Sequence, residues 1–301
     1  MTTGKILDGR VAIVTGASGG LGRCHALELA RHGAKIVVND LGRDAAEKVA
    51  EEIRAAGAEA MAVPASVTDE EAVAAMVTQT VERWGRVDIL VNNAGILRDK
   101  SFAKMEMADF RLVVDVHLMG AAICTKAVWE TMRVQKHGRI VMTTSSSGLY
   151  GNFGQANYGA AKMALVGLTQ TLAIEGEKYG IRVNCLAPTA ATQMTEGVLA
   201  EQALSRLNPG LVSPGIVHLA RDEAPTRAIL CAGAGHFAAA NITLTKGAHI
   251  GSGDDAATDI AARWDEITDR TDEIVPAYGF TQAEREIASA GHDSGALAVS
   301  Q

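Results

Sequence analysis

The sequence contains few cysteines, and none of them sits in a metal-binding or disulfide pattern. The four cysteines are Cys24, Cys124, Cys185 and Cys231. They are far apart and form no CxxC or Cys/His cluster, which excludes a disulfide framework and a zinc site and predicts that no metal is bound. No apolar segment approaches the roughly 20 residues needed to span a bilayer, and the amino end lacks the charged and apolar regions of a signal peptide. We therefore expect a soluble, cytoplasmic protein with no membrane partner.

Basic charge is not concentrated anywhere in the chain. The formal net charge is −7, and it belongs to the tail: from Gly251 onward there are eleven acidic and three basic residues, against 24 acidic and 25 basic residues before it. Neither part has the basic stripe that binding to nucleic acid requires, so this class of partner is excluded. The chain also lacks low-complexity tracts and internal repeats, which excludes most disordered and array architectures.

What is present is an alternation of short strand-like runs with helical ones. A chain of 301 residues with 48% hydrophobic content can bury a sizeable core. The alternation predicts a parallel sheet with helices on both faces. Right-handed crossovers make this a doubly wound α/β fold of the Rossmann type with about seven strands, whose ligands lie beyond the carboxyl ends of the strands. The predicted strands are Val11–Val14, Lys35–Val38, Ala60–Val63, Val87–Val91, Arg139–Thr143, Ile181–Leu186 and Ala228–Cys231.

The strand pattern stops at about Gly251, which divides the chain into a Rossmann domain, residues 1–250, and an acidic carboxyl-terminal extension, residues 251–301. The run from Gly251 to Asp255 is typical of a linker that ends in a helix cap. Two surface helices are predicted in the extension, from Asp255 to Thr268 and from Gln282 to Ser289. We expect this helical extension to pack on the domain or at an oligomer interface.

A glycine-rich turn, Thr15 to Gly22, follows the first predicted strand and opens a predicted helix from Leu21 to Arg31. Glycines let the backbone turn sharply and approach a pyrophosphate, while the free N–H groups at the helix start attract its charge. Taken alone, such a turn is as often purely structural. As a nucleotide site, its contacts would come from Gly16, Ser18, Gly20, Leu21 and Gly22.

Asp40 ends the second predicted strand, about 20 residues beyond the glycines, where a carboxylate accepts hydrogen bonds from ribose hydroxyls and repels a 2′-phosphate. This placement favours NAD over NADP, although a capping role in a turn is an alternative. The segment Asn92 to Gly95 follows the fourth predicted strand. It would lie beside the nucleotide at the switch point of the sheet, or would be an ordinary Asn/Gly turn.

Tyr158 and Lys162 lie one turn apart on a predicted helix. Proton exchange with an alcohol needs a phenol whose pKa lies below its ordinary value of about 10, and a nearby ammonium favours the phenolate. Ser145, thirteen positions before the tyrosine, follows the fifth predicted strand, where a hydroxyl can hydrogen-bond a developing alkoxide. Tyr/Lys pairs on surface helices and serines in polar loops are common, so each feature alone is weak. No GxSxG motif surrounds the serines, which argues against a hydrolase nucleophile.

In this order and spacing, the glycine-rich turn, Asn92 to Gly95, Ser145, Tyr158 and Lys162 resemble the short-chain dehydrogenase/reductase family, from about Arg10 to Pro188. The resemblance implies that Tyr158 is the general acid/base, that Lys162 lowers the pKa of Tyr158 and holds the nicotinamide ribose, and that Ser145 orients the substrate oxygen. It also implies homodimers or homotetramers. The implied contacts to NAD beyond the glycine-rich turn and Asp40 are Val67, Asn93, Ala94, Gly95, Tyr158, Lys162, Pro188 and Thr192.

Four longer segments narrow the resemblance to the (3R)-hydroxyacyl-CoA dehydrogenase units of peroxisomal multifunctional enzymes of type 2. They are Val38–Gly42, Gly95–Phe102, Asp115–Leu118 and Tyr150–Tyr158. This narrower likeness implies NAD-dependent interconversion of (3R)-3-hydroxyacyl-CoA and 3-oxoacyl-CoA. One alternative is a dehydrogenase for hydroxysteroids or other apolar secondary alcohols. A second is a 3-oxoacyl-carrier-protein reductase, which Asp40 disfavours because such enzymes usually prefer NADPH. A third is a dinucleotide-binding regulatory protein without turnover.

The chain departs from the family pattern at two places. Many members have Asn where this chain has His117, in the helix expected to carry water to the lysine. An imidazole can also relay a proton, so His117 is a candidate catalytic residue, with an ordinary packed histidine as the alternative. After Pro188 the usual glycine is replaced by Thr189, which predicts a different loop over the nicotinamide and leaves Thr192 as the candidate contact to the carboxamide.

Overall fold

The computed structural model describes residues 5–191 and 206–291 of the chain. Its central element is an eight-stranded sheet in the order β3-β2-β1-β4-β5-β6-β7-β8. The first seven strands are parallel, and β8 runs antiparallel to β7. The predicted doubly wound fold is confirmed, with one antiparallel edge strand added. The strands are β1 Val11–Thr15, β2 Lys35–Asp40, β3 Ala60–Pro64, β4 Ile89–Asn92, β5 Gly138–Thr143, β6 Ile181–Thr189, β7 Ile229–Gly233 and β8 His236–Ala240.

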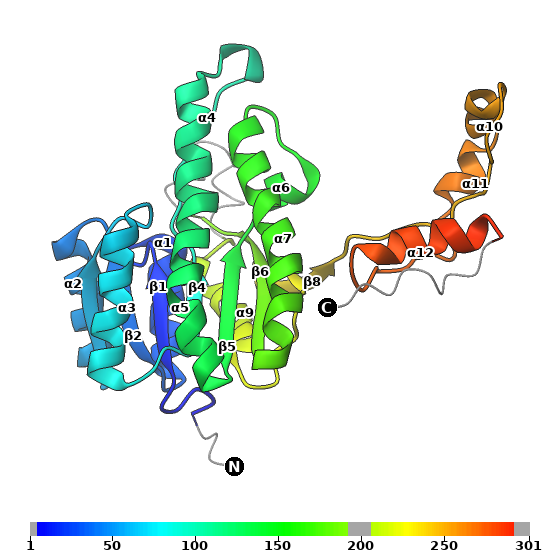
Figure 1. Cartoon of the computed structure of the whole chain (residues 1–301). Coiled ribbons are helices and arrows are strands. Elements are labelled where there is room, and N and C mark those ends of the chain that lie inside the picture. The colour runs from blue at the N-terminus through cyan, green and yellow to red at the C-terminus, as the bar shows by residue number, and fades with distance from the viewer. Residues whose placement is uncertain (1–4, 192–205, 292–301) are drawn as a thin grey trace. The chain divides into compact units, whose positions relative to one another are not determined.

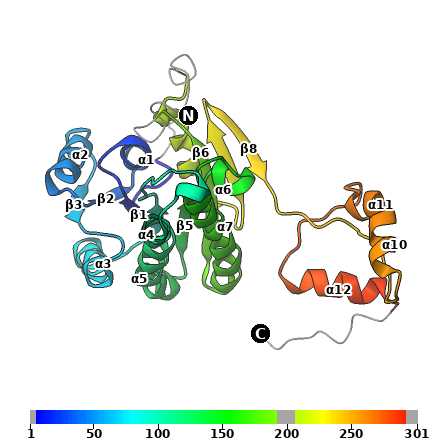
Figure 2. The ribbon, with the colours of Figure 1, turned by 90° about the horizontal axis from the view of Figure 1, so that it is seen from above.

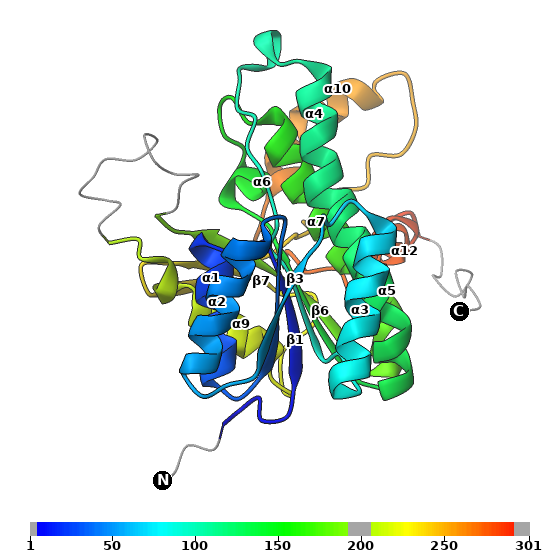
Figure 3. The same ribbon diagram turned by 90° about the vertical axis from the view of Figure 1, so that its left-hand side faces the viewer.

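Helices cover both faces of the sheet, and each face has its own apolar core. Helices α1, α2 and α9 lie on one face, and α3, α5 and α7 lie on the other (Figures 2 and 3). In α3, the predicted helical spacing places Val73, Met76 and Val77 inward, where all three are buried. The helices are α1 Gly20–Arg31, α2 Arg43–Ala55, α3 Glu70–Trp84, α4 Met107–Val114, α5 Gly120–Gln135, α6 Ser146–Tyr150, α7 Ala156–Gly176 and α9 Ser213–Ala220.

The order of the strands reverses between β1 and β4, because β1 pairs with β2 on one side and with β4 on the other. In a doubly wound sheet this switch point opens a crevice at the carboxyl ends of the strands. The segments that follow β1, β4 and β5 therefore converge at one edge of the sheet, near the start of α7 (Figure 1). This is the edge at which the sequence places its candidate residues.

One continuous helical stretch, Met107–Gln135, is long and apolar enough to cross a membrane, with a mean hydropathy of 1.5. By length and composition alone, this corrects the expectation that no segment approaches such a span. The stretch consists of α4, a π-helical turn and α5. On α5, Cys124, Val128 and Met132 are buried in the core against the sheet.

The chain divides into two compact units, Met1–Ala240 and Asn241–Gln301, ten residues before the boundary that the sequence suggests. In the second unit, Leu244 and Ile274 form an antiparallel bridge, and the Arg285 guanidinium donates to the carbonyl oxygen of Leu244. The helix predicted from Asp255 is divided at Arg263. The helices of this unit are α10 Ala256–Ala262, α11 Trp264–Thr268 and α12 Phe280–Ser289. That the extension packs on the domain or at an oligomer interface stays a prediction.

Candidate functional site

The glycine-rich turn between β1 and α1 is closely packed at Gly16 and Gly22 and open at Gly19, where the helix starts. At Gly16, where φ is +63°, a Cβ atom would lie 2.8 Å from the Cα of Ala94, and at Gly22 it would lie 2.1 Å from the Gly16 carbonyl oxygen. At Gly19, the N-cap of α1, a Cβ would meet nothing within 4 Å. Among the described residues no side chain caps α1, and its first turn holds no acidic residue. The exposed N–H groups at this helix start fit the pyrophosphate of a dinucleotide.

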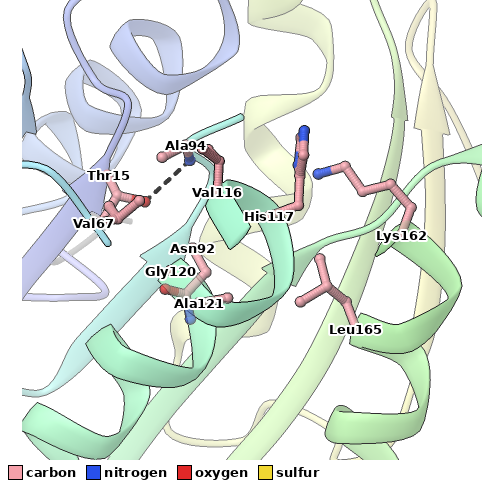
Figure 4. A pocket seen from close by; sticks show the side chains of 10 residues that line it. All are labelled: Thr15, Val67, Asn92, Ala94, Val116, His117, Gly120, Ala121, Lys162 and Leu165. Carbon is pink, nitrogen blue, oxygen red and sulfur yellow. Dashed lines mark hydrogen bonds between the residues drawn. The ribbon is translucent and has the colours of Figure 1, made fainter. Parts of the chain in front are cut away.

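The segment after β4 is tied to this turn by four hydrogen bonds. The Thr15 hydroxyl accepts from the backbone N–H of Asn93 (3.0 Å) and from that of Ala94 (3.1 Å), the bond drawn in Figure 4. The Asn93 amide donates to the carbonyl oxygens of Thr15 (3.0 Å) and Gly16 (3.1 Å). The structure therefore brings two separate sequence motifs together at the switch point of the sheet.

Asp40 ends β2 beside the glycine-rich turn, as expected. Its Oδ2 accepts from the Ser18 N–H (3.0 Å) and the Ser18 hydroxyl (2.6 Å), and its Oδ1 accepts from the N–H of Leu41 (2.8 Å). The carboxylate thus organises the turn, as in the capping interpretation, and also stands at the position that contacts an adenosine ribose in this kind of fold.

Three side chains expected to carry chemistry meet at the carboxyl edge of β5. Ser145 is the N-cap of α6, where its Oγ accepts from the N–H of Ser147 (3.2 Å). Tyr158 and Lys162 lie in the first turns of α7, and the Lys162 ammonium is 5.5 Å from the centroid of the Tyr158 ring. Lys162 is buried, and its Nζ donates to the carbonyl oxygen of Thr143 (2.6 Å).

Burial dominates the protonation of this group. It raises the pKa of the Tyr158 phenol above its ordinary value, and a hydrogen bond with Ser145 opposes the rise. Burial also lowers the pKa of Lys162 to about 7. The sequence predicts a lowered phenol pKa because of the neighbouring ammonium, whereas the structure shows the opposite direction, since losing water disfavours the phenolate and the ammonium alike.

His117 lies in the π-helical turn Asp115–Met119, between α4 and α5, and is buried. Its ring stands edge-on to the ring of Tyr158, with 5.2 Å between the centroids. Its Nε2 lies 3.0 Å from the backbone nitrogen of Ile96 and 2.8 Å from the carbonyl oxygen of Ile96. Burial first, and the charge of Lys162 second, lower the pKa of His117 to about 3. The imidazole is therefore neutral at physiological pH.

We call the glycine-rich turn, Asp40 and Asn93 the cofactor end of the site, and Ser145, Tyr158, Lys162 and His117 the catalytic end. A pocket lies between the two ends (Figure 4). It is lined by Thr15 and Val67 on one side and by His117 and Lys162 on the other. Val67 packs against Gly120 at the start of α5, where a Cβ would lie 2.6 Å from the Val67 Cγ2.

The remaining predicted contacts follow β6. Pro188 pairs with Ala232 in the register of β6 and β7. Thr192 lies outside the described residues. Thr189, which replaces the usual glycine, is exposed at the end of β6.

Sequence reasoning missed three positioning groups. Thr15 supplies the hydroxyl that anchors the segment after β4, and Ile96 supplies the backbone that holds His117. Asn157 donates to the carbonyl oxygen of Arg98 (3.0 Å) and accepts from the N–H of Tyr158 (2.7 Å), so it fixes a distant loop to the start of α7. An Asn at a helix start is the one local signal that points to such a role.

Comparisons with known proteins agree with this geometry. Residues 10–203 match the model of the short chain dehydrogenase family. The chain is 50% identical over 225 residues to peroxisomal multifunctional enzyme type 2 of Drosophila melanogaster, covering 72% of this chain and 37% of that enzyme. It is 45% identical over 270 residues to a short-chain type dehydrogenase/reductase of Mycobacterium tuberculosis, covering 86% of this chain and 94% of the relative. The chain therefore spans little more than a third of the multifunctional enzyme.

Solved structures give the same result. The full-length Drosophila melanogaster enzyme superposes with a TM-score of 0.79 and 37% identity, covering 96% of this chain and 51% of that one. A 7α-hydroxysteroid dehydrogenase in complex with NADH and 7-oxo glycochenodeoxycholic acid superposes with a TM-score of 0.72 and 30% identity, covering 78% of this chain and 97% of that one. With the dinucleotide-type turn and the Ser145, Tyr158 and Lys162 group in place, the chain belongs to the short-chain dehydrogenase/reductase family of oxidoreductases.

Proposed function

We propose that the protein catalyses NAD-dependent interconversion of a secondary alcohol and a ketone, with (3R)-3-hydroxyacyl-CoA as the alcohol. The observation that carries the proposal is the gathering of Ser145, Tyr158 and Lys162 at the carboxyl edge of β5, across the switch point from an uncapped helix start. The cytoplasmic location and the homodimeric or homotetrameric assembly stay predictions.

The proposed mechanism assigns one task to each of these side chains. Ser145 donates a hydrogen bond to the alcohol oxygen and holds it toward Tyr158. As phenolate, Tyr158 accepts the hydroxyl proton, and in the reverse direction it returns this proton to the ketone oxygen. Lys162 supplies positive charge, and with its pKa of about 7 it exchanges protons readily near neutral pH. When bound, NAD supplies the hydride acceptor and, in its oxidised form, a positive charge that favours the phenolate.

Asp40 supports NAD rather than NADP. Its carboxylate is fixed by Ser18 and Leu41, so it cannot swing away from a 2′-phosphate without losing these hydrogen bonds. Repulsion between the two anions disfavours NADP, whereas ribose hydroxyls donate to the same carboxylate.

The rim of the site supports a large amphipathic substrate. The loop after β4 is fastened to the segment before α7, because Lys100 N–H donates to the Gly154 carbonyl oxygen (2.9 Å) and Gln155 donates to Asp99 (2.6 Å). Two phenylalanines on this rim are exposed, Phe102 by 70% and Phe153 by 89%, and they fit an acyl chain or pantetheine.

Basic side chains lie on the same loop. Within residues 5–191 and 206–291, the ion pairs of Arg98 and Lys100 are long ones with Asp109, at 3.8 and 3.9 Å. Because exposed pairs of this kind contribute little, both cations are available to the phosphates of CoA, as is the exposed Lys104. An apolar substrate such as a hydroxysteroid is the second candidate, since the exposed phenylalanines fit it equally and a hydroxysteroid dehydrogenase shares the fold.

Steady-state oxidation of (3R)- and (3S)-3-hydroxyacyl-CoA, of the corresponding free acid and of a hydroxysteroid, each with NAD and NADP, tests the proposal. We expect turnover of the (3R)-thioester with NAD and a much higher KM for the free acid. A preference for the steroid would show that the substrate is a hydroxysteroid rather than a 3-hydroxyacyl-CoA. A preference for NADP would favour a carrier-protein reductase. Dinucleotide binding without reduction of NAD by any of these alcohols would indicate a regulatory protein.

A further inference from the structure

The environment of His117 gives its imidazole two alternative hydrogen-bond patterns. Nε2 faces both polar backbone groups of Ile96, the N–H at 3.0 Å and the carbonyl oxygen at 2.8 Å. A neutral imidazole nitrogen either carries a proton and donates, or is bare and accepts. It can therefore satisfy the carbonyl oxygen or the N–H of Ile96, but not both at once. An asparagine side chain, with separate oxygen and nitrogen atoms, does not face this choice.

The surroundings of the other ring nitrogen, Nδ1, determine which nitrogen of His117 carries the proton. His117 Nδ1 is buried and makes no hydrogen bond to any of the residues 5–191 and 206–291. The Lys162 side chain points toward the His117 ring (Figure 4). The two groups form no hydrogen bond in the described residues, but the charge of Lys162 acts on the imidazole. An ammonium near the ring disfavours a proton on Nδ1 and so favours a bare Nδ1, whereas a neutral amine exerts no such charge and permits a proton there.

We propose that His117 is a positioning residue whose tautomer follows the protonation of Lys162 and thereby selects which backbone group of Ile96 is held. With Lys162 as ammonium, Nδ1 is bare and Nε2–H donates to the Ile96 carbonyl oxygen. With Lys162 as neutral amine, the imidazole proton is on Nδ1, and Nε2 accepts from the Ile96 N–H. The imidazole carries one proton in both states, and the net change is the release of one proton from Lys162 to water.

The protonation behaviour of the two groups fits this arrangement. The pKa of Lys162 is lowered to about 7, so both of its states are populated near neutral pH. The pKa of His117 is lowered to about 3, so its tautomer changes while its charge does not. The groups on α7 that act on His117 are Lys162, through its charge, and Tyr158, through its ring. Asp99 acts on Tyr158, and Asp115 on the same turn as His117 is exposed.

A change of the His117 tautomer would act directly on the loop after β4. Ile96 follows Gly95, where a Cβ atom would lie 2.2 Å from the His117 Cε1, so ring and loop are in close contact. The same loop continues to Arg98, whose carbonyl oxygen is held by Asn157 next to Tyr158. A change in the bond at Ile96 therefore reaches both the rim and the start of α7.

The test is the nitrogen NMR spectrum of the cofactor-free protein labelled with 15N-histidine, recorded from about pH 6 to 8 around the pKa of Lys162. Signals of His117 are assigned by their loss in His117→Asn. We expect the fraction of His117 protonated on Nδ1 to rise across this range, and to be constant in Lys162→Met. His25 is an internal control, because it is fully buried and its Nδ1 is paired with the Ser213 hydroxyl (2.9 Å); its tautomer should stay constant.

Three results would overturn the proposal: one His117 tautomer throughout in the wild type, an imidazolium that titrates near its ordinary pKa, or the same transition in Lys162→Met. Circular dichroism and thermal unfolding verify that both variants fold. The meaning of the switch for catalysis rests on the proposed function, but the spectrum does not, so a titrating tautomer in a protein that oxidises no alcohol would refute only the proposed function.

Kinetics give an independent readout. His117→Asn can satisfy both groups of Ile96 at once, so we expect it to retain kcat within about fivefold while the KM for the alcohol loses its dependence on pH near neutrality. His117→Ala should lose kcat by more than tenfold. An equal loss in both variants would show that the imidazole acts by proton transfer rather than by positioning.

Discussion

The cofactor end and the catalytic end of the site hold their polar groups in different ways. At the cofactor end, Thr15, Asn93 and the Ser18–Asp40 pair bind one another and the backbone around the glycine-rich turn. At the catalytic end, Asn92, His117 and Thr143 each leave a buried side-chain atom without a hydrogen bond to the described residues. Apart from Asn39 Oδ1 and His25 Nε2, the first end is organised before any ligand binds. The second end combines such unpaired atoms with two titratable groups whose pKa values are shifted, His117 and Lys162.

This difference shows where each property comes from. A closed network fixes geometry, which suits the recognition of a constant ligand. Buried titratable groups have shifted pKa values and are found at sites of chemistry. Lys162, with a pKa lowered to about 7 by burial, is such a titratable group.

The largest expected effect is at the catalytic end. Tyr158→Phe removes the only atom of that side chain that exchanges a proton, and we expect kcat to fall by about 10³-fold, within the range of general acid/base catalysis. The KM for NAD should change much less than kcat, because Tyr158 is one of many implied contacts to NAD and most of the others lie in the glycine-rich turn and in the segment after β4. Steady-state kinetics measure both values, with Tyr150→Phe, on the exposed end of α6, as the matched control. Wild-type turnover in Tyr158→Phe would refute the assignment.

One added methyl group in the glycine-rich turn should disrupt the packing of the cofactor end and lower the stability of the protein. Gly22→Ala places a Cβ 2.1 Å from the Gly16 carbonyl oxygen, and overpacking of this kind costs about 1–3 kcal/mol. Gly19→Ala is the control, because its Cβ meets nothing within 4 Å and its φ of −164° suits any residue. Urea unfolding without NAD should separate the two variants, and equal stabilities would show that the turn is not closely packed.

Both ends could be predicted from the sequence to different degrees. The seven parallel strands and the Tyr158/Lys162 pair follow from local patterns, namely apolar runs and the spacing of one helical turn. Strand β8 could not be predicted, because His236–Ala240 is an exposed edge without alternation of apolar and polar residues. The pKa of Tyr158 was predicted in the wrong direction, because the burial that raises it is a property of the tertiary structure.

Contacts between distant residues explain the other omissions. The bond between His117 and Ile96 joins positions 21 residues apart through a π-helical turn, and no sequence pattern marks such a turn. Likewise, the hydroxyl of Thr15 meets Asn93 and Ala94 only after β1 and β4 pair in the sheet.

A smaller effect is expected at Asp40, the residue of the cofactor end that should distinguish NAD from NADP. Asp40→Ala removes the carboxylate that accepts from Ser18 and from a ribose, and we expect the Kd for NADH to rise by about tenfold or more, since a hydrogen bond to a charged group contributes about 1.5–3 kcal/mol. The Kd for NADPH should fall. Fluorescence titration measures both without turnover. Asp44→Ala, in the first turn of α2, makes the same change in charge nearby, and an equal effect there would reduce the role of Asp40 to general electrostatics.

The last prediction concerns His25, on α1, which departs from the closed network of the cofactor end because its Nε2 has no hydrogen bond to the described residues. Burial lowers its pKa from 6.5 to about 3, so between these values the unfolded chain binds a proton that the folded protein does not. Stability therefore falls as pH falls below 6.5, by at most about 1.4 kcal/mol per pH unit for one group. Urea unfolding at several pH values should give a smaller slope for His25→Gln than for the wild type. Equal slopes would mean that α1 and α9 separate enough to admit water, and the cofactor end would then be less closed than its hydrogen bonds indicate.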